Sequence, residues 1–548
     1  MKLACLLVLL LLVWVHSQPP RSVRSNETSL TVAELVALRN GAKDAFLHSY
    51  DSYMAHGFPF DEVMPISCGA RKWQNRDRGT LDDAFGGYML TLVDSLDTLL
   101  VMKEYDRYLL GLAKLRHLSF ERDTEVSVFE SSIRVLGGLL SAHQLTAELL
   151  RGEYDGFLLD KAVLLADKLL PAFATATGIP IHKVNLLKGV SQAEQRHTCT
   201  AAGGSYLLEF SLLSRLTGDP VYEQAAKKAT DALWGRRSKL NLVGSLIHTG
   251  TGRWLNENSG FGAGIDSFFE TLLKTAILLN DQGLMKTFEE SYRAIMYHTL
   301  LEEGLHVDVD MHKGNRKATS SIISGLSGFW PALQVLAGDT LSAKATFGFF
   351  HSIWSKFGAL PDVFDLETNS VRDYSLDSPN RPELLESAYH LYTATKDDKY
   401  IFFGRDVLTH LNTRLKVKCG YASLGDVVTG RLDDRMDSFF LAETLKYLYL
   451  LFDEGLPAEL RTSLFCNSDS GHSRAGTPIN GLINKNTSAA ENGRLLSENG
   501  RDFDGFCVNP LSVIFSTEGH VFQVQQDFRP QGQPQGPPIP LYYCPLVT

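Results

Sequence analysis

Seven short polar breaks interrupt a chain whose apolar residues otherwise follow helical spacing, and their regular recurrence restricts the possible folds strongly. The last four intervals between successive breaks are 62, 58, 58 and 56 residues, and the first two are 49 and 66 residues. The breaks lie at residues 103–105, 152–154, 218–220, 280–281, 338–339, 396–398 and 452–453. Recurrence at a nearly fixed period indicates a chain built from repeated supersecondary units.

The segments on both sides of a break show the i, i+3, i+4 apolar spacing of amphipathic helices. A leucine-rich segment such as 207–216 precedes the break, and a second segment such as 222–234 follows it. Each unit is therefore predicted to be a helical hairpin. Seven hairpins form either an open solenoid or a closed ring, and the absence of a polar capping repeat at either end favours the ring. The sequence predicts an all-α fold in which residues 40 to about 455 form one barrel of seven hairpins.

The residues beyond the last break have a different character. Residues 461–501 are rich in Ser, Asn and Gly, which predicts an exposed insertion. Residues 513–524 then alternate as β-strands do, with Gly519 at the expected turn. A hairpin at this point would plug one end of the barrel and project its turn into the cavity, so the domain is expected to cover residues 40–525. The Gln- and Pro-rich residues 526–548 predict an unstructured tail.

The amino terminus is typical of a secreted protein. The thirteen apolar residues from Leu3 to Val15 predict a cleaved signal peptide over residues 1–17. An uncleaved anchor is the alternative, but the run is shorter than the roughly 18–20 residues of a spanning helix, and no later segment is predicted to cross a membrane. The last four residues, Pro-Leu-Val-Thr, match no retrieval signal, so residence in the endoplasmic reticulum would depend on a partner.

The cysteines and sequons agree with an oxidising compartment. Six cysteines remain after the predicted signal peptide, and six cysteines permit fifteen pairings. Asn26 and Asn486 each begin a sequon for N-glycosylation.

The overall charge argues against nucleic acid as a partner. The chain has 53 Lys and Arg residues against 63 Asp and Glu residues, so it lacks the basic surplus that neutralises phosphates. The hydrophobic fraction of 44% is enough for a large buried core and excludes a mostly disordered chain.

Several carboxylates interrupt helix faces that are otherwise apolar, on four different repeats. A structural interpretation exists for each of them: an intrahelical pair for Glu130 with Arg134, a complement to the helix dipole after Pro382, and a cap or polar core role for the others. The acids are Glu130, Asp266, Glu270, Glu383, Glu386 and Glu443.

The position of these acids favours a functional interpretation. Each lies on the helix that begins its hairpin, and those helices would line the axis of a closed ring. Crowding and burial there would raise the pKa of some carboxyl groups and leave others ionised. Paired acids with separated pKa values are what glycoside hydrolysis needs, and Phe439 would offer an apolar face to a sugar ring. The sequence has no phosphate loop, placed dinucleotide fingerprint or paired Cys or His metal motif.

Several of these segments resemble class I α-1,2-mannosidases, which form glycoside hydrolase family 47. The segments are LVDSLDT (92–98), FESSIRVLGGLLSA (129–142), RPELLES (381–387), MDSFFLAETLKY (436–447) and STEGH (516–520). Residues 262–268 and 418–422 most resemble the branch of ER degradation-enhancing α-mannosidase-like proteins. The resemblance implies an (α/α)7 barrel with a C-terminal hairpin plug.

The resemblance also implies roles for individual residues. Glu130 would be the general acid and Glu383 the general base of an inverting hydrolase, with Asp266 beside the leaving oxygen as a candidate for proton delivery. Thr517 would bind Ca²⁺, and Glu386, Glu443 and Glu518 would hold coordinated water or the sugar. Arg134 and Phe439 would line the same subsite.

Further expectations concern the cysteines and the function. The resemblance implies a disulfide between Cys68 and Cys419 and a partner of the protein disulfide isomerase type. It implies a calcium-dependent enzyme of the endoplasmic reticulum lumen that trims high-mannose N-glycans on misfolded glycoproteins, marking them for degradation. Two alternatives stay open: a mannose-binding, lectin-like degradation factor with little or no turnover, and a helical scaffold whose acids are incidental.

Overall fold

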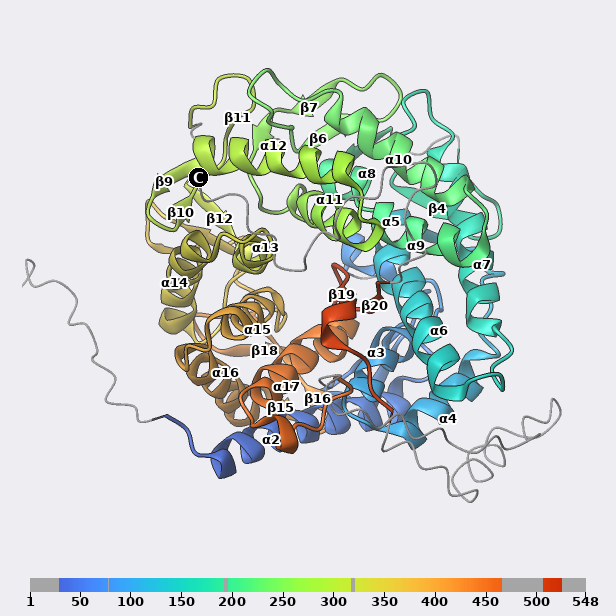
Figure 1. The fold of residues 1–548 in the computed structure, drawn as a ribbon, viewed down its shortest axis with the longest axis vertical. Helices are drawn as coiled ribbons and strands as arrows, with labels where there is room; N and C mark the ends of the chain where they lie inside the picture. Colours follow the sequence, from blue (N-terminus) through green and yellow to red (C-terminus); the bar gives the residue numbers. More distant parts are fainter. Residues whose placement is uncertain (1–28, 77, 192–195, 317–320, 466–505, 525–548) are drawn as a thin grey trace, which may run out of the picture.

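Two concentric rings of helices surround one axis in the computed structural model (Figure 1). The structure describes residues 29–76, 78–191, 196–316, 321–465 and 506–524. The predicted signal peptide, the tail, both sequons and all but the first five residues of the predicted insertion lie outside the described residues.

The helices alternate between the rings along the chain. The inner ring consists of α3 (Leu90–Val101), α6 (Gly137–Leu150), α9 (Leu207–Thr217), α11 (Asp266–Leu279), α13 (Trp330–Leu336), α15 (Glu383–Thr395) and α17 (Leu445–Glu454). The outer ring consists of α4 (Tyr105–Leu115), α7 (Phe157–Leu169), α10 (Val221–Trp234), α12 (Gln282–Thr299), α14 (Thr340–Phe357), α16 (Lys399–His410) and α2 (Val32–Ser52). The predicted all-α barrel of seven helical pairs is therefore confirmed.

Burial separates the two rings. All twelve residues of α3 and all seven residues of α13 are buried, because inner helices contact neighbours on every side. Outer helices bury one stripe only, which in α14 consists of residues 343, 346, 347, 350 and 353 at the spacing of an amphipathic helix.

The aspartates that recur along the sequence bond to backbone N–H groups where the outer helices begin. Asp281 accepts hydrogen bonds from the N–H groups of Gly283 and Leu284 at 2.8 and 3.1 Å, and Asp339 accepts one from Ser342 at 3.1 Å. Such side chains satisfy N–H groups that have no partner within the helix. The repeat in the sequence is thus a repeat of helix starts.

The seventh break differs from the others because no outer helix follows it. The partner of α17 is α2, from the start of the described chain. Asp453 accepts a hydrogen bond from Arg39 of α2 at 3.2 Å, and both side chains are buried. This pairing closes the ring, and it explains why the barrel begins at Val32 and not at residue 40 as predicted.

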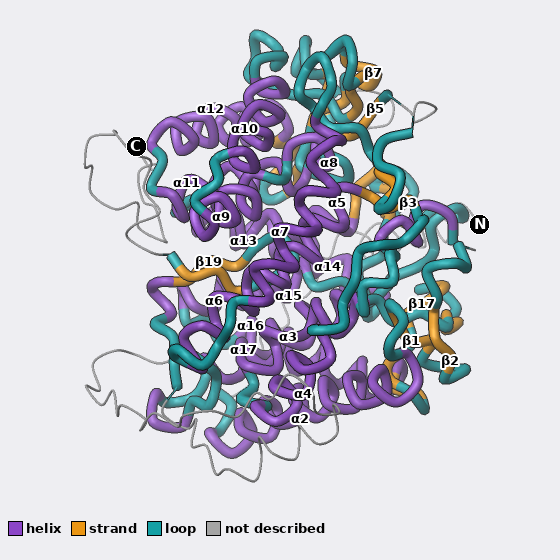
Figure 2. The backbone as a smooth tube through the Cα atoms, turned by 90° about the vertical axis from the view of Figure 1, so that its right-hand side faces the viewer, coloured by secondary structure: helices purple, strands orange, loops and turns teal. Residues whose placement is uncertain are grey.

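Longer connections carry short antiparallel strands, and most of these lie at the opposite end from β19 and β20 (Figure 2). They are β1 (Glu62–Met64), β2 (Gly69–Arg71), β3 (Glu125–Ser127), β4 (Lys183–Asn185), β5 (His197–Cys199), β6 (Leu246–His248), β7 (Trp254–Asn256), β8 (Asn258–Ser259), β9 (Leu300–Glu302), β10 (Leu305–His306), β11 (Val309–Asp310), β12 (Ile322–Ser324), β13 (Val363–Asp365), β14 (Ser370–Val371), β15 (Lys416–Val417), β16 (Gly420–Tyr421), β17 (Ser423–Asp426) and β18 (Arg431–Asp433). Two short helices, α5 (Val128–Glu130) and α8 (Thr200–Gly204), precede α6 and α9. No helix among the described residues has the length and apolar character needed to span a membrane.

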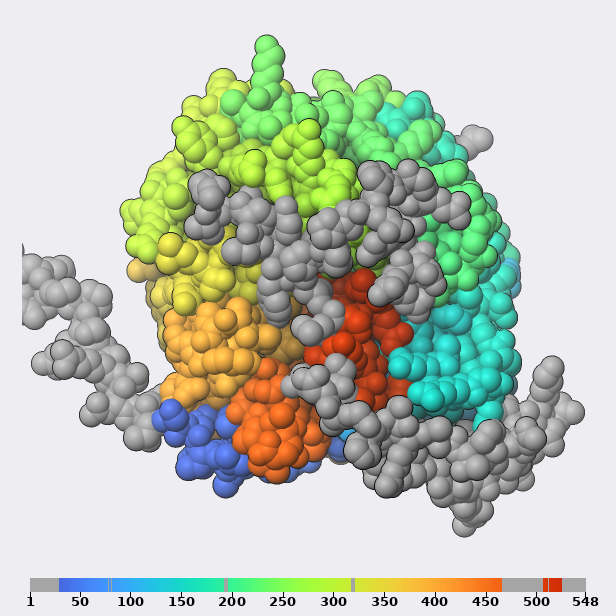
Figure 3. Space-filling model, in the orientation of Figure 1, coloured from blue at the N-terminus to red at the C-terminus, as the bar shows by residue number. Residues whose placement is uncertain are grey.

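The expected C-terminal hairpin lies in the centre of the ring. Strands β19 (Val513–Phe515) and β20 (Val521–Gln523) pair in register from Val513 with Gln523 to Phe515 with Val521. Their atoms fill the middle of one face, between the orange helices and the cyan helices of Figure 3. The turn contains Gly519 at a positive φ of 65°, where a Cβ atom would approach the Glu443 side chain to 3.1 Å.

A buried network of charges holds this turn in place. His520 contacts Asp94 at 3.2 Å and Asp97 at 3.4 Å, and Lys446 contacts Asp97 at 2.8 Å. Lys446 also donates a hydrogen bond to the carbonyl oxygen of Gly519 at 2.7 Å. Hairpin and inner ring are therefore joined by ion pairs as well as by apolar packing.

Candidate active site

A cavity of about 400 Å³ lies on the barrel axis. Its lining combines the turn of the β19–β20 hairpin, the starts of inner helices and parts of the long connections. All nine residues predicted to act on substrate or metal line it, namely Glu130, Arg134, Asp266, Glu383, Glu386, Phe439, Glu443, Thr517 and Glu518. The structure brings together side chains that are up to 388 positions apart in the sequence.

Glu130 and Arg134 form the intrahelical pair that the sequence suggested, and they also face the cavity. Arg134 Nε donates to Glu130 Oε2 at 2.8 Å, and Arg134 Nη1 donates to Glu518 Oε2 at 2.5 Å. Arg134 thus connects an inner helix to the plug. Its guanidinium also lies 5.5 Å from the centroid of the Phe439 ring, which leaves an apolar ring beside a fixed cation.

Two of the helices that carry site residues contain rare π-helical segments. One covers Ser131–Leu136 and includes Arg134, and the other covers Phe440–Thr444 and includes Glu443. Such segments widen a helix by one residue and often occur at functional sites, because they redirect a side chain without ending the helix.

Asp266 is the first residue of α11, and its carboxylate lines the cavity. Burial raises its pKa to about 7, and the nearby carboxylates of Glu270 and Glu130 act in the same direction. The N–H group of Ser267 donates to Asp266 Oδ1 at 2.9 Å, which opposes that rise. Asp266 can therefore hold a proton near neutral pH.

Glu383 and Glu386 lie one turn apart at the start of α15. Burial raises the pKa of Glu383 to about 8, although Arg381, 3.9 Å away, lowers it. Glu383 Oε2 is buried without a hydrogen-bond partner among the described residues. A buried carboxylate oxygen without a partner is costly, and such an atom marks a place where a substrate or water is expected.

The remaining acids form a crowded group in the same cavity. Burial raises the pKa of Glu386 to about 7 and that of Glu518 to about 8, and it raises the pKa of Glu443 well above its usual range. Lys274 approaches Glu386 at 3.5 Å, but it also pairs with Glu270 at 2.5 Å. Carboxylates thus outnumber cations in this group, and the imbalance favours the binding of a cation.

Thr517 provides the clearest observation on the expected metal. Its Oγ1 atom is buried and has no hydrogen-bond partner among the described residues. It lines the cavity with Glu386, Glu443 and Glu518, and hydroxyl and carboxylate oxygens are ligands that Ca²⁺ prefers.

Sequence reasoning missed several residues that line the cavity or pair with its acids. Lys274 interrupts an apolar helix just as the acids do, so the same criterion applies to it. Asp83 lies in a short 3₁₀ helix, Gly79–Ala84, and His182 lies in an irregular connection, so no sustained helical spacing marks their inward direction. Arg381 donates two hydrogen bonds to Asp362, at 2.6 and 2.9 Å, and stands beside Glu383.

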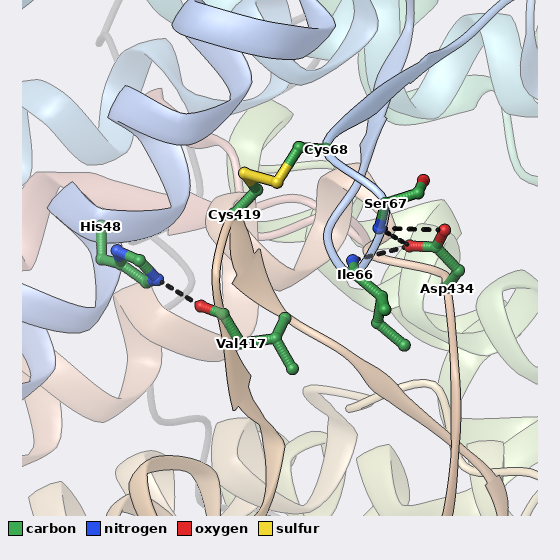
Figure 4. Close-up of a disulfide and its surroundings, with 7 residues drawn as sticks. All are labelled: His48, Ile66, Ser67, Cys68, Val417, Cys419 and Asp434. Carbon is green, nitrogen blue, oxygen red and sulfur yellow. Dashed lines mark hydrogen bonds between the residues drawn. A yellow bond between two sulfur atoms is a disulfide. The ribbon is translucent and has the colours of Figure 1, made fainter.

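Cys68 and Cys419 are joined in the expected disulfide (Figure 4). The bond connects the β1–β2 turn with the β15–β16 turn, across 351 positions of the sequence. Cys507 is also disulfide-bonded, whereas Cys199 is a free cysteine whose pKa is raised to about 11 by burial.

Comparisons with known proteins agree with this architecture. The model of Glycosyl hydrolase family 47 matches residues 45–469. The chain is 44% identical to Alpha-mannosidase I MNS4 of Arabidopsis thaliana over 77% of its length and 43% identical to human ER degradation-enhancing alpha-mannosidase-like protein 2 over 76%. The matches span 66% and 70% of those two relatives.

A solved structure shows the same fold. The α-1,2-mannosidase from Trichoderma reesei superposes with a TM-score of 0.69 at 22% identity, covering 89% of this chain and 99% of that one. The match of the family model over most of the chain, together with the relatives above 40% identity, shows that the chain belongs to glycosyl hydrolase family 47.

Proposed function

We propose that the protein is a calcium-dependent, inverting α-1,2-mannosidase that trims high-mannose N-glycans. The observation that carries the proposal is the convergence of Glu130, Asp266 and Glu383, from three different hairpins, on one axial cavity. Hydrolysis of a glycoside needs an acid at the leaving oxygen and a base for water, held on either side of the reacting sugar. The names of the relatives supply the sugar and the linkage.

The acids of the cavity would divide these roles. Glu383 would accept the proton of the attacking water, and its raised pKa places it in the range where a general base is effective near neutral pH. Glu130 would protonate the leaving oxygen. Asp266, with a pKa of about 7, is suited to deliver a proton to that position. Arg134 would fix the orientation of Glu130 through their hydrogen bond.

The metal would be held by Thr517 directly and by Glu386, Glu443 and Glu518 through water. Calcium would supply positive charge that orients the hydroxyl groups of the sugar. The partnerless Thr517 hydroxyl and the shortage of cations around these acids support this assignment.

The cellular role proposed is disposal of misfolded glycoproteins in the endoplasmic reticulum lumen. It rests on the relatives named as ER degradation-enhancing proteins. A partner of the protein disulfide isomerase type would meet the Cys68–Cys419 bond, since Cys68 is half-buried in a turn beside exposed Ser67 whereas Cys419 is buried.

The decisive experiment is release of mannose from a purified high-mannose glycan. Wild type is expected to release mannose, and both a chelator and Glu383→Gln are expected to abolish release. Proton NMR of the first product tests inversion, which predicts that β-mannose appears before mutarotation. Release that survives both the chelator and the substitution would refute the proposed mechanism.

A lectin-like degradation factor is the alternative. Wild type would then bind the glycan without releasing mannose. In cells, faster disposal of a misfolded glycoprotein by wild type and by Glu383→Gln alike would favour this alternative, and loss of the effect in Glu383→Gln would favour the enzyme.

A further inference from the structure

A second cavity, of about 530 Å³, adjoins the axial cavity. It lies between the fourth hairpin (α11 and α12) and the fifth (α13 and α14), where Thr299 of α12 and Thr346 of α14 line it. Two residues, Leu326 and Arg381, line both cavities. The second cavity therefore continues from the axis toward the outer ring.

The partition between the cavities is built from residues next to the proposed catalytic groups. Residues 260–263 line the second cavity, and Asp266 in the same stretch lines the first. Arg381 is fixed on the partition, because its guanidinium makes two hydrogen bonds to Asp362 in the second cavity and lies 3.9 Å from Glu383 in the first. A molecule too large for one cavity would reach the other beside Arg381.

The lining of the second cavity has the chemistry of a sugar site. Phe261, Phe349 and Phe350 provide apolar surface, and Asn258, Ser324 and Thr346 provide neutral polar groups. Such a mixture of aromatic surface with a few polar groups is typical of sites for small uncharged ligands, and the volume lies within their usual range of roughly 300–1,000 Å³. Since Asp362 pairs with Arg381, the cavity offers no surplus cation to an anionic ligand.

Thr346 gives an independent sign of a ligand. Its side chain is 1% exposed, and its Oγ1 atom has no hydrogen-bond partner among the described residues. Leaving a buried hydroxyl without a partner is costly, so a core position of this kind is normally apolar. Valine has nearly the same shape and would avoid that cost, which indicates that the hydroxyl serves a ligand in the cavity.

We propose that the second cavity binds hexose units of the same glycan that are not themselves cut. One arm of a branched glycan would enter the axial cavity for hydrolysis, while another arm would extend past Arg381 between the fourth and fifth hairpins. This inference rests on the proposed mannosidase function and adds a second binding site to it. The protein would then distinguish branched glycans from short linear ones of the same linkage.

Filling the second cavity tests the proposal. Ser375→Trp places a large side chain in the lining, and Thr346→Val removes only the hydroxyl. With a nine-mannose branched glycan as substrate, Ser375→Trp is expected to raise KM at least tenfold and Thr346→Val two- to fivefold. With α-1,2-linked mannobiose, which needs only the axial cavity, both variants are expected to stay within twofold of wild type. Tyr374→Trp is the matched control, because Tyr374 is 74% exposed and is not part of the lining.

Two results would overturn the proposal. An equal rise in KM for both substrates would mean that the substitutions only distort the axial cavity, and unchanged KM for the branched glycan would mean that the second cavity holds solvent alone. Thr346→Val keeps the test valid if Ser375→Trp does not fold.

Calorimetry separates this inference from the proposed function. If wild type cleaves neither substrate, the proposed function fails, and binding of the branched glycan to Glu383→Gln and to the Glu383→Gln, Ser375→Trp double variant decides the second site alone. Affinity reduced tenfold in the double variant supports the site, and equal affinity refutes it.

Discussion

Two groups of buried charges lie beside the turn of the plug: one around Asp97, called here the lower group, and one around Glu443, called here the upper group. In the lower group, Asp97 contacts Lys446 at 2.8 Å and His520 at 3.4 Å, and it accepts a hydrogen bond from the N–H of Val521 at 3.0 Å. Its pKa is held well below its usual range, with Lys446 and His520 lowering it against the effect of burial. This group is balanced in charge.

In the upper group, negative charges outnumber positive ones. Glu383, Glu386 and Glu443 have raised pKa values because burial outweighs the opposing effects of Arg381, Arg134 and a Lys274 that Glu270 shares. The balanced charges hold in place the turn that carries Thr517 and Glu518. The unbalanced acids have excess negative charge that a bound cation or a substrate would compensate. Perturbed carboxyl groups in a cavity are therefore the better guide to function, and paired ones are the better guide to structure.

The largest expected effect separates activity from stability at Glu130, which lines the same cavity as the upper group. Glu130→Gln is expected to lower kcat by about 10²–10⁴, the usual contribution of a general acid. The free energy of unfolding should change by less than about 1 kcal/mol, because Glu130 is partly exposed and Arg134 keeps its bond to Glu518. Mannose release and urea denaturation measure the two effects. A large loss of stability would mean that the Glu130–Arg134 pair is structural.

The corresponding change in the lower group should act on stability. Asp97→Asn leaves Lys446 and His520 without their buried counter-charge, and breaking a buried pair costs about 3–5 kcal/mol. Thermal unfolding should show a clear fall in Tm, whereas Asp373→Asn at an exposed position should not. An unchanged Tm would contradict the view that this group holds the plug.

The sequence predicted the parts of the fold that depend on local signals. The recurring aspartates predicted the hairpins because they bond to N–H groups at the starts of outer helices, and the acids on apolar segments predicted the axial cavity. The closing pair was beyond this reasoning: α17 meets α2 through Arg39 and Asp453, which are 414 positions apart, and no local pattern identifies such a contact.

The same limit applies to the site. Glu130, Asp266 and Glu383 lie at the starts of inner helices, where helical spacing indicates an inward direction. Asp83 comes from a short 3₁₀ helix, and His182 and much of the lining of the second cavity come from connections without periodicity, so their side chains had no predictable direction.

The pH dependence of stability should reveal the unbalanced acids. Folded pKa values near 8 for Glu383 and Glu518 and near 7 for Glu386 exceed the unfolded value of about 4.5, so the folded state retains protons that the unfolded state releases. The stability of the metal-free protein should therefore fall as the pH rises from 5 to 8. His520 acts in the same direction. Its pKa is raised to about 9, so the stability that protonated His520 contributes is lost as the pH rises through that value.

Urea denaturation at pH 5.5, 7 and 8.5, with a chelator and with excess Ca²⁺, measures this dependence. The fall should be smaller with Ca²⁺, since a bound cation favours the ionised acids. Stability of the metal-free protein that is constant or rises over this range would show that the carboxylates are compensated in a way the structure does not indicate.

The smallest expected effect comes from Glu443→Gln, the substitution in the upper group that corresponds to Asp97→Asn in the lower group. Glu443→Gln replaces a carboxyl whose pKa is raised well above its usual range by burial and by Glu518, Glu383 and Glu386, so the folded metal-free protein favours its uncharged form. Exchanging a neutral acid for a neutral amide of the same shape should change the free energy of unfolding by less than about 1 kcal/mol, and in the stabilising direction as the pH rises. Stabilisation by added Ca²⁺ should be reduced, because one of the acids expected to hold its water is gone, while Glu303→Gln at an exposed position should leave that stabilisation intact. If Glu443→Gln destabilises the metal-free protein as much as Asp97→Asn does, the two groups do not differ in kind, and the unbalanced acids are part of the same structural network as the paired ones.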